Sequence, residues 1–241
     1  MTTEKQRIWE LDAIRGISIL GMVAIHIPIN ISIFADVELT LPWWYHFLKD
    51  YGYLFFVLIS GICVTLASRS FKRGIAVFGA GLLVSYVTLF MDLILGFDEM
   101  RIWFGILHML GACMMLYPIF KRLPAWALLI VGIVFCALGI WFETLTVPVD
   151  YLFPIGLCPK GVYTGGDYFP LFPGIGWFLI GAWIGKTLYR NKQSLLPKVN
   201  SKNPIISFFC ACGKHSLIIY LLHQPVITLI TVLFMKLNIF H

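Results

Sequence analysis

The first long apolar stretch of the sequence carries polar side chains with the types and spacing of an acid–base site. At 100° per residue, Asp12, Arg15, Met22, His26 and Asn30 fall near one face of a helix. Arg15 and His26 are eleven residues apart, which is about 16 Å along a helix axis. An imidazole in a water-poor environment favours its uncharged, proton-accepting form, and a guanidinium binds phosphate or amide groups. This stripe predicts a general base and an anion-binding group on one helix.

The last apolar stretch repeats the pattern. Ser216, Tyr220 and His223 are spaced i, i+4 and i+7, so they share one helix face, and Gln224 follows directly. We interpret this face as a second set of polar groups that meets the first inside a helical bundle. For His223, packing and function are equally good interpretations.

Two stretches in the middle of the chain also contain polar residues. Ser85, Thr88 and Asp92 are spaced as on one helix face, and His108 lies between two glycines that let a helix or a ligand come close. Solvation near the outer end of its helix would account for Asp92. His108 is explained equally well by packing and by function.

The cost of burying charge decides between interpretations in the first stretch. An ionisable residue in hydrocarbon costs about 2.5–3.5 kcal/mol or more unless it is paired or wetted, which makes function the better interpretation of His26. Asp12 and Arg15, at i and i+3, are explained equally well as an ion pair at the helix entrance. His46 and His241 lie in or near predicted loops, and we assign them no role.

The composition indicates that these helices cross a membrane. Of 241 residues, 59% are hydrophobic and 12% are charged, and the mean hydropathy is +0.86. Ordinary soluble domains are about half apolar and about a quarter charged. A soluble domain, a disordered chain, a collagen-like repeat and a disulfide-stapled secreted scaffold are excluded, and a polytopic membrane protein remains.

The hydrophobic runs predict an all-α integral membrane protein, a bundle of about seven transmembrane helices. The runs are Ile14–Phe34, Tyr51–Ser68, Ile75–Leu95, Ile102–Phe120, Ala125–Phe142, Phe172–Leu188 and Ser216–Lys236. Most of the 18 lysines and arginines fall on the side of the N-terminus, which predicts a cytoplasmic N-terminus and an outer C-terminus. The same distribution accounts for the net charge of +6 without a nucleic acid partner.

The sequence contains no internal repeat and no linker, so we expect residues 1–241 to form a single domain. Its longest outer connection, Glu143–Leu171, combines prolines and glycines with several aromatic residues. Loops of this length in compact architectures are usually functional or disordered. We expect an ordered loop that folds over the bundle and belongs to the same domain.

Five motifs in order give the chain a resemblance to a known family. They are Leu11–Gly16 with Ile25 and His26, Phe55–Gly61, Phe104–His108, Asp167–Pro173 and Gly213–Pro225. Together they resemble the compact bacterial relatives of heparan-α-glucosaminide N-acetyltransferase. The first and last motifs are also similar to the acyltransferase-3 family, which modifies cell-surface polysaccharides.

The resemblance implies an acyl-CoA-dependent O- or N-acetyltransferase in the bacterial cytoplasmic membrane. It would move an acetyl group from cytosolic acyl-CoA, which is a substrate and not a bound cofactor, to a sugar or amino-sugar acceptor on the outer side. No metal is implied, and a homo-oligomer is left open. The acyltransferase-3 pattern carries its functional arginine and histidine onto Arg15 and His26.

The sequence departs from the family in two places. The heparan enzyme places its catalytic histidine in the loop after the first helix, and residues 34–50 contain no secure counterpart. Gly174 follows Pro173 where the relatives usually place tryptophan, which predicts a wider acceptor pocket.

These considerations assign a role to each candidate residue. We expect His26 to be the base, an acetylated histidine being an alternative route. The assigned groups are catalytic His26, His223 and His108, donor-binding Asp12, Arg15, Ser216, Tyr220 and Gln224, and acceptor-binding Asn30, Asp167 and Tyr168. A small-solute transporter would also use a polar interior. A membrane cytochrome with pairs of His26, His108 and His223 as haem ligands is the less favoured alternative.

Overall fold

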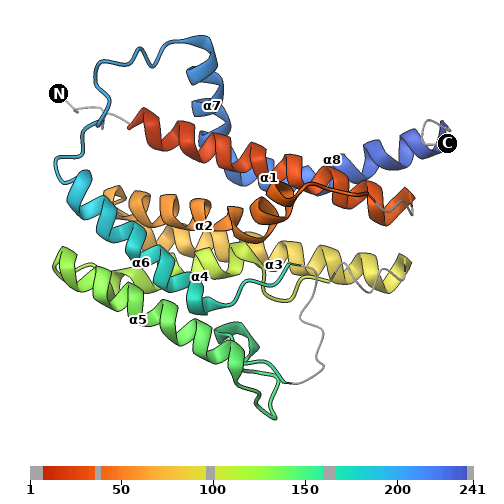
Figure 1. Cartoon of the computed structure of the whole chain (residues 1–241), viewed down its shortest axis with the longest axis horizontal. Helices are drawn as coiled ribbons and strands as arrows, with labels where there is room; N and C mark the ends of the chain where they lie inside the picture. Colours follow the sequence, from red (N-terminus) through yellow and green to blue (C-terminus); the bar gives the residue numbers. More distant parts are fainter. Residues whose placement is uncertain (1–7, 36–38, 96–100, 160–166, 238–241) are drawn as a thin grey trace. The chain divides into compact units, whose positions relative to one another are not determined.

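The computed structural model describes residues 8–35, 39–95, 101–159 and 167–237, and its elements are helices (Figure 1). In chain order they are α1 (Trp9–Ala35), α2 (Trp43–Leu66), α3 (Ser70–Leu95), α4 (Ile106–Phe120), α5 (Ala125–Thr144), the 3₁₀ turn η2 (Phe153–Ile155), α6 (Leu171–Leu188), α7 (Pro204–Lys214) and α8 (Ser216–Lys236).

The long helices confirm the predicted class of fold. Among the described residues, six helices are long and apolar enough to cross a bilayer, namely α1, α2, α3, α5, α6 and α8. The chain is therefore an integral, multi-pass membrane protein of the all-α class. Helices α4 and α7 are apolar but shorter.

Helix α4 is shorter than the predicted run Ile102–Phe120, because its first residues are held out of the helix. The hydroxyl of Ser85 donates to the carbonyl of Ile102, and the N–H of Ile102 donates to the hydroxyl of Thr88 at 3.2 Å. These bonds tie Ile102 to α3 in a non-helical conformation, and regular helix begins at Ile106.

The chain divides into two compact units. One comprises residues 1–56 and 192–241, the other residues 57–191, and α2 contributes to both. The expectation of a single domain and the orientation of the termini across the membrane stay predictions.

In the first unit, α1 packs against α7 and α8. Helix α8 runs alongside α1, whereas α7 stands across it (Figure 1). Two glycines permit this crossing: a Cβ on Gly16 would lie 1.9 Å from the carbonyl oxygen of Phe209, and one on Gly213 would lie 1.8 Å from that of Asp12. Side chains at either position would force the two helices apart.

In the second unit, α3 pairs with α4 and α5 pairs with α6. The end of α2 approaches α6 closely through Gly61, whose Cβ would lie 2.0 Å from the carbonyl oxygen of Phe178. Gly174 does not open a pocket: it is buried, and its ideal Cβ would meet the sulfur of Met109 at 2.7 Å. The missing tryptophan is thus offset by a methionine from α4, which corrects the expected widening.

Candidate functional site

Two of the predicted histidines meet in the first unit. The rings of His26 on α1 and His223 on α8 contact each other edge to face, with centroids 4.9 Å apart and an interplanar angle of 82°. His26 is half-buried, and His223 is 9% exposed. The contact leaves no room for a porphyrin between the two rings, so this pair as arranged does not fit two axial ligands of one haem.

Both rings are held in the same tautomer by the backbone of their own helices. Nδ1 of His26 lies 2.8 Å from the carbonyl oxygen of Met22, and Nδ1 of His223 bonds the carbonyl of Tyr220. A carbonyl only accepts hydrogen bonds, so each Nδ1 carries the proton and donates it. Each Nε2 consequently carries a lone pair, which is the form required of a base.

The Nε2 atom of His223 is buried and has no hydrogen-bond partner among the described residues. Buried polar atoms are nearly always bonded, and an unbonded one calls for an explanation such as a ligand or a catalytic role. An acceptor lone pair in this position suits an incoming O–H or N–H group. The pair of imidazoles therefore offers two basic nitrogens in a largely enclosed place.

A buried amide next to the histidines joins α1 to α8. Asn30, fully buried, donates to the carbonyl of His26 at 3.1 Å and to Oε1 of Gln224 at 2.9 Å. Its own Oδ1 accepts a bond from the hydroxyl of Thr228 at 2.9 Å. Every polar side-chain atom of Asn30 is thus engaged within the protein. Asn30 lies one turn from His26 on α1, and its partner Gln224 is the residue after His223 on α8.

At the N-terminal end of α1, the polar stripe contains an ion pair. Nη1 of Arg15 lies 3.2 Å from Oδ1 of Asp12, and it also contacts the carbonyl of Gly213 at 3.5 Å. The side chains of Arg15 and Asp12 are 21% and 10% exposed, so the guanidinium is largely enclosed but reachable. Ser216 and Tyr220 lie on α8, where the Tyr220 ring is 5.4 Å from that of His223.

His108 lies in the second unit, and both of its ring nitrogens are engaged. Nδ1 accepts a bond from the N–H of Gly105 at 3.2 Å, so the proton is on Nε2, which faces the hydroxyl of Ser85 at 3.4 Å. The ring stacks on Phe104 and meets the edge of Phe78, both with centroids 5.3 Å away. These contacts hold the segment before α4 against α3.

Asp167 and Tyr168 also lie in the second unit, next to the start of α4. A Cβ on Gly105 would lie 3.1 Å from Oδ2 of Asp167, and the N–H of Phe169 donates to the carbonyl of Phe104 at 3.0 Å. A carboxylate beside a helix N-terminus is stabilised by the helix dipole. The end of the connection between α5 and α6 is thereby fixed on α4.

The hydroxyl of Tyr168 donates to the carbonyl of Phe153 in η2 and accepts a bond from Sγ of Cys158 at 3.4 Å. Burial, followed by the hydrogen bond with Cys158, raises the pKa of the Tyr168 hydroxyl, which stays protonated and keeps its bond to Phe153. The two described parts of the connection between α5 and α6, on either side of residues 160–166, are therefore joined to each other.

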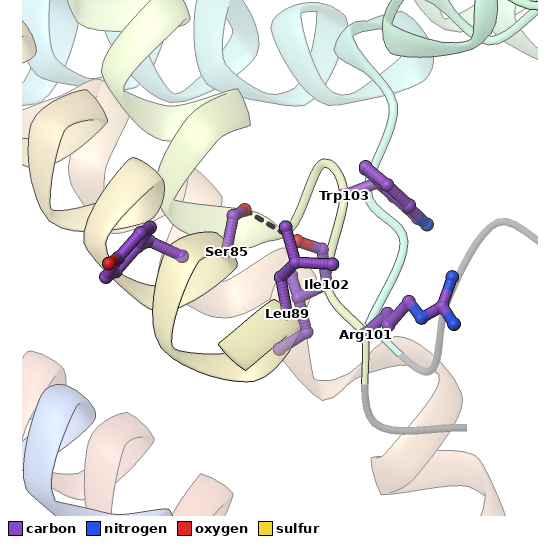
Figure 2. A pocket seen from close by; sticks show the side chains of 6 residues that line it. Ser85, Leu89, Arg101, Ile102 and Trp103 are labelled. Atoms are coloured by element: carbon purple, nitrogen blue, oxygen red, sulfur yellow. Dashed lines mark hydrogen bonds between the residues drawn. The ribbon is translucent and has the colours of Figure 1, made fainter. Parts of the chain in front are cut away.

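Asp92 is not solvated, which corrects one expectation. It is 4% exposed, and its carboxylate pairs with Nε of Arg101. Close to this pair lies a small cavity of about 100 Å³, lined by Ser85, Tyr86, Leu89, Arg101, Ile102 and Trp103 (Figure 2). Ligand sites usually measure about 300–1,000 Å³, so this cavity is too small for a sugar or an acyl-CoA.

Sequence reasoning missed Thr228 and Tyr45, which both bind α1. Thr228 bonds Asn30, and the hydroxyl of Tyr45 donates to the carbonyl of Ile25 at 2.6 Å. For Thr228 a signal was present: Gln224 and Thr228 on α8 repeat the i, i+4 spacing of His26 and Asn30 on α1.

The chain is similar to a known protein family. Residues 7–225 match the family model described as heparan-alpha-glucosaminide N-acetyltransferase, catalytic. No curated protein and no solved structure matches the chain.

Proposed function

Because the chain belongs to the heparan-α-glucosaminide N-acetyltransferase catalytic family, we propose that it transfers an acetyl group from acetyl-CoA to a sugar or amino-sugar acceptor. The single observation that carries this proposal is the pair of imidazoles, His26 and His223, which both present Nε2 as a base. In our proposal the donor comes from the cytosol and the acceptor binds on the opposite side of a bacterial cytoplasmic membrane.

His26 takes the proton of the acceptor in this mechanism. As the acceptor oxygen or nitrogen attacks the thioester carbonyl, its proton passes to Nε2 of His26 and a C–O or C–N bond forms. The C–S bond then breaks, and the coenzyme A thiolate leaves and receives the proton from the imidazolium. General-base catalysis of this kind contributes typically about 10²–10⁴-fold to a rate.

His223 and Gln224 divide the remaining tasks. Neutral His223 has its only N–H on the carbonyl of Tyr220, so its Nε2 accepts a hydrogen bond from the acceptor O–H or N–H group and does not act as an oxyanion donor. The amide oxygen of Gln224 accepts a hydrogen bond from Asn30, which fixes the orientation of the amide. The N–H groups of Gln224 then stabilise the developing oxyanion. Asn30 then acts by holding Gln224 and the backbone of His26 in place.

The ion pair of Arg15 and Asp12 supports a donor-binding role. Asp12 orients the guanidinium, and a guanidinium is the group best suited to bind a phosphate or amide oxygen of the donor. We propose that Ser216 and Tyr220 bind the donor because they lie on α8 with His223, and that Asp167 and Tyr168 bind the acceptor because they lie in the connection between α5 and α6.

Purified protein in lipid nanodiscs tests the proposal directly. We expect free thiol from acetyl-CoA only when a suitable acceptor, drawn from a panel of amino sugars and glycan fragments, is present. Sugar flux without consumption of acetyl-CoA would instead indicate a transporter. Labelled acetyl that stays on the protein without an acceptor would indicate the two-step route.

A matched pair of histidine variants locates the base. His26→Ala should abolish transfer and leave the protein folded, whereas His46→Ala should have the activity of the wild type, because His46 is exposed at the start of α2. The opposite result would place the base near the start of α2, after the first helix, as in the heparan enzyme.

A further inference from the structure

Helix α7 packs beside the beginnings of two helices that are long enough to span a membrane, α1 and α8. It is followed, after His215, by α8, whose 21 residues span about 31 Å and are thus all needed to cross the hydrocarbon. Its contacts with α1 fall on the first turns of that helix, at Trp9, Asp12 and Gly16. The first turns of α1 also carry charged residues, which belong at the membrane surface and not in its centre.

The direction of α7 agrees with a position in the plane of the membrane. It stands across α1 and α8, which both cross the bilayer (Figure 1). One face, with Cys210 and Gly213, is buried against α1. The other face exposes Ile205 to 68% and Phe208 to 56%.

The segment around α7 is strongly basic. Residues 192–215 contain Lys192, Lys198, Lys202 and Lys214, which are all exposed, and no aspartate or glutamate. The nearby carboxylate of Glu10 is occupied, because it accepts bonds from the Leu195 N–H at 2.7 Å and the Ser194 hydroxyl at 2.9 Å. These bonds also tie the basic segment to the start of α1.

We propose that α7 is an interfacial helix that binds anionic lipid headgroups. Its apolar face, Ile205 and Phe208, enters the boundary between headgroups and acyl chains, and the surrounding lysines contact lipid phosphates. The inference does not depend on the acetyltransferase activity. It rests on the placement of α7, its two faces and the charge of the segment that contains it.

Site-specific photocrosslinking in nanodiscs of equal parts phosphatidylcholine and phosphatidylglycerol tests this. With a benzophenone amino acid in place of Phe208, we expect lipid adducts in which phosphatidylglycerol exceeds phosphatidylcholine by about five-fold or more, since each lysine near a charged surface contributes about that factor. Position 229 on α8, where Leu229 is 70% exposed, is the control for lipid contact. Position 201, at an exposed serine before α7, is the control for water.

A second variant separates charge from burial. Lys198→Gln, Lys202→Gln and Lys214→Gln together should bring the ratio of the two lipids at position 208 toward one, while adducts at position 229 are unchanged and report a folded protein. Three results at position 208, in the protein that keeps its lysines, would each overturn the proposal. They are the absence of lipid adducts, adducts with both lipids in equal amounts, and a crosslink to a second copy of the chain. Displacement of phosphatidylglycerol by acetyl-CoA would also overturn it, because the lysines would then bind the donor.

Discussion

His108 in the second unit and His223 in the first are both buried histidines on apolar helices, but their rings are bound in opposite ways. His108 accepts a bond at Nδ1 and directs Nε2 toward the hydroxyl of Ser85. His223 donates from Nδ1 and leaves Nε2 buried without a partner among the described residues. In His108 both ring nitrogens hold a segment of the chain in place, whereas in His223 one ring nitrogen is left without a hydrogen bond to the described residues.

Burial alone does not distinguish a structural histidine from a reactive one. His108 is 2% exposed and His223 is 9% exposed, so exposure does not distinguish them. The hydrogen-bond inventory does, because a base needs an atom that the protein itself has not bound. The catalytic role predicted for His108 stays a prediction, and its contacts favour a positioning role.

After His26→Ala, which should abolish transfer, the largest effect is expected from His223→Ala. Removal of the second basic nitrogen should lower kcat by about 10²–10⁴-fold, with little change in the midpoint of thermal unfolding in detergent. Steady-state assays of thiol release and a melting curve measure the two quantities. A variant that unfolds more readily but keeps its turnover would show that His223 serves packing, as the contacts of His108 do.

Arg15→Ala should act on the donor and not on the chemistry. Loss of hydrogen bonds to a charged group, about 1.5–3 kcal/mol, should raise the KM for acetyl-CoA by about 10–100-fold with kcat little changed. Arg15→Lys keeps the charge without the planar fork and should give an intermediate KM. A fall in kcat at unchanged KM would place Arg15 in the chemical step.

His108→Ala should mainly destabilise the protein. It leaves the Gly105 N–H without its acceptor and removes the bond to the Ser85 hydroxyl, which keeps its bond to the Ile102 carbonyl. We expect this loss to cost about 2 kcal/mol in the free energy of unfolding. His108→Gln should recover part of this loss, because a glutamine at the third helical position can accept the N–H of the residue before the helix. Loss of turnover in both variants, with stability unchanged, would contradict the positioning role.

The smallest effect is expected from Thr228→Val, which removes the hydroxyl bound by Asn30 and keeps the shape. Hydrogen bonds between membrane helices average about 0.6 kcal/mol, so unfolding should change little and kcat should fall only a few-fold. Thr228→Ser should restore the wild-type value. A changed KM for acetyl-CoA instead would indicate that this end of the stripe binds the donor.

Much of the fold followed from the sequence, because hydropathy and helical periodicity are local properties. The polar stripes on α1 and α8 could be recognised for the same reason. The partners across helices could not, since the bonds of Asn30 with Gln224 and Thr228 depend on which faces meet. The late start of α4 and the pairing of Asp92 with Arg101 likewise depend on contacts between segments distant in the chain.

The anchoring of His26 and His223 through Nδ1 limits where a proton can travel. A ring that holds its other N–H on a backbone carbonyl cannot pass a proton from one face to the opposite face without first breaking that bond. Whatever Nε2 picks up must leave by the same atom. Such rings suit a site in which a proton is accepted and returned within one turnover. They are poorly suited to a relay that conducts protons across a bilayer.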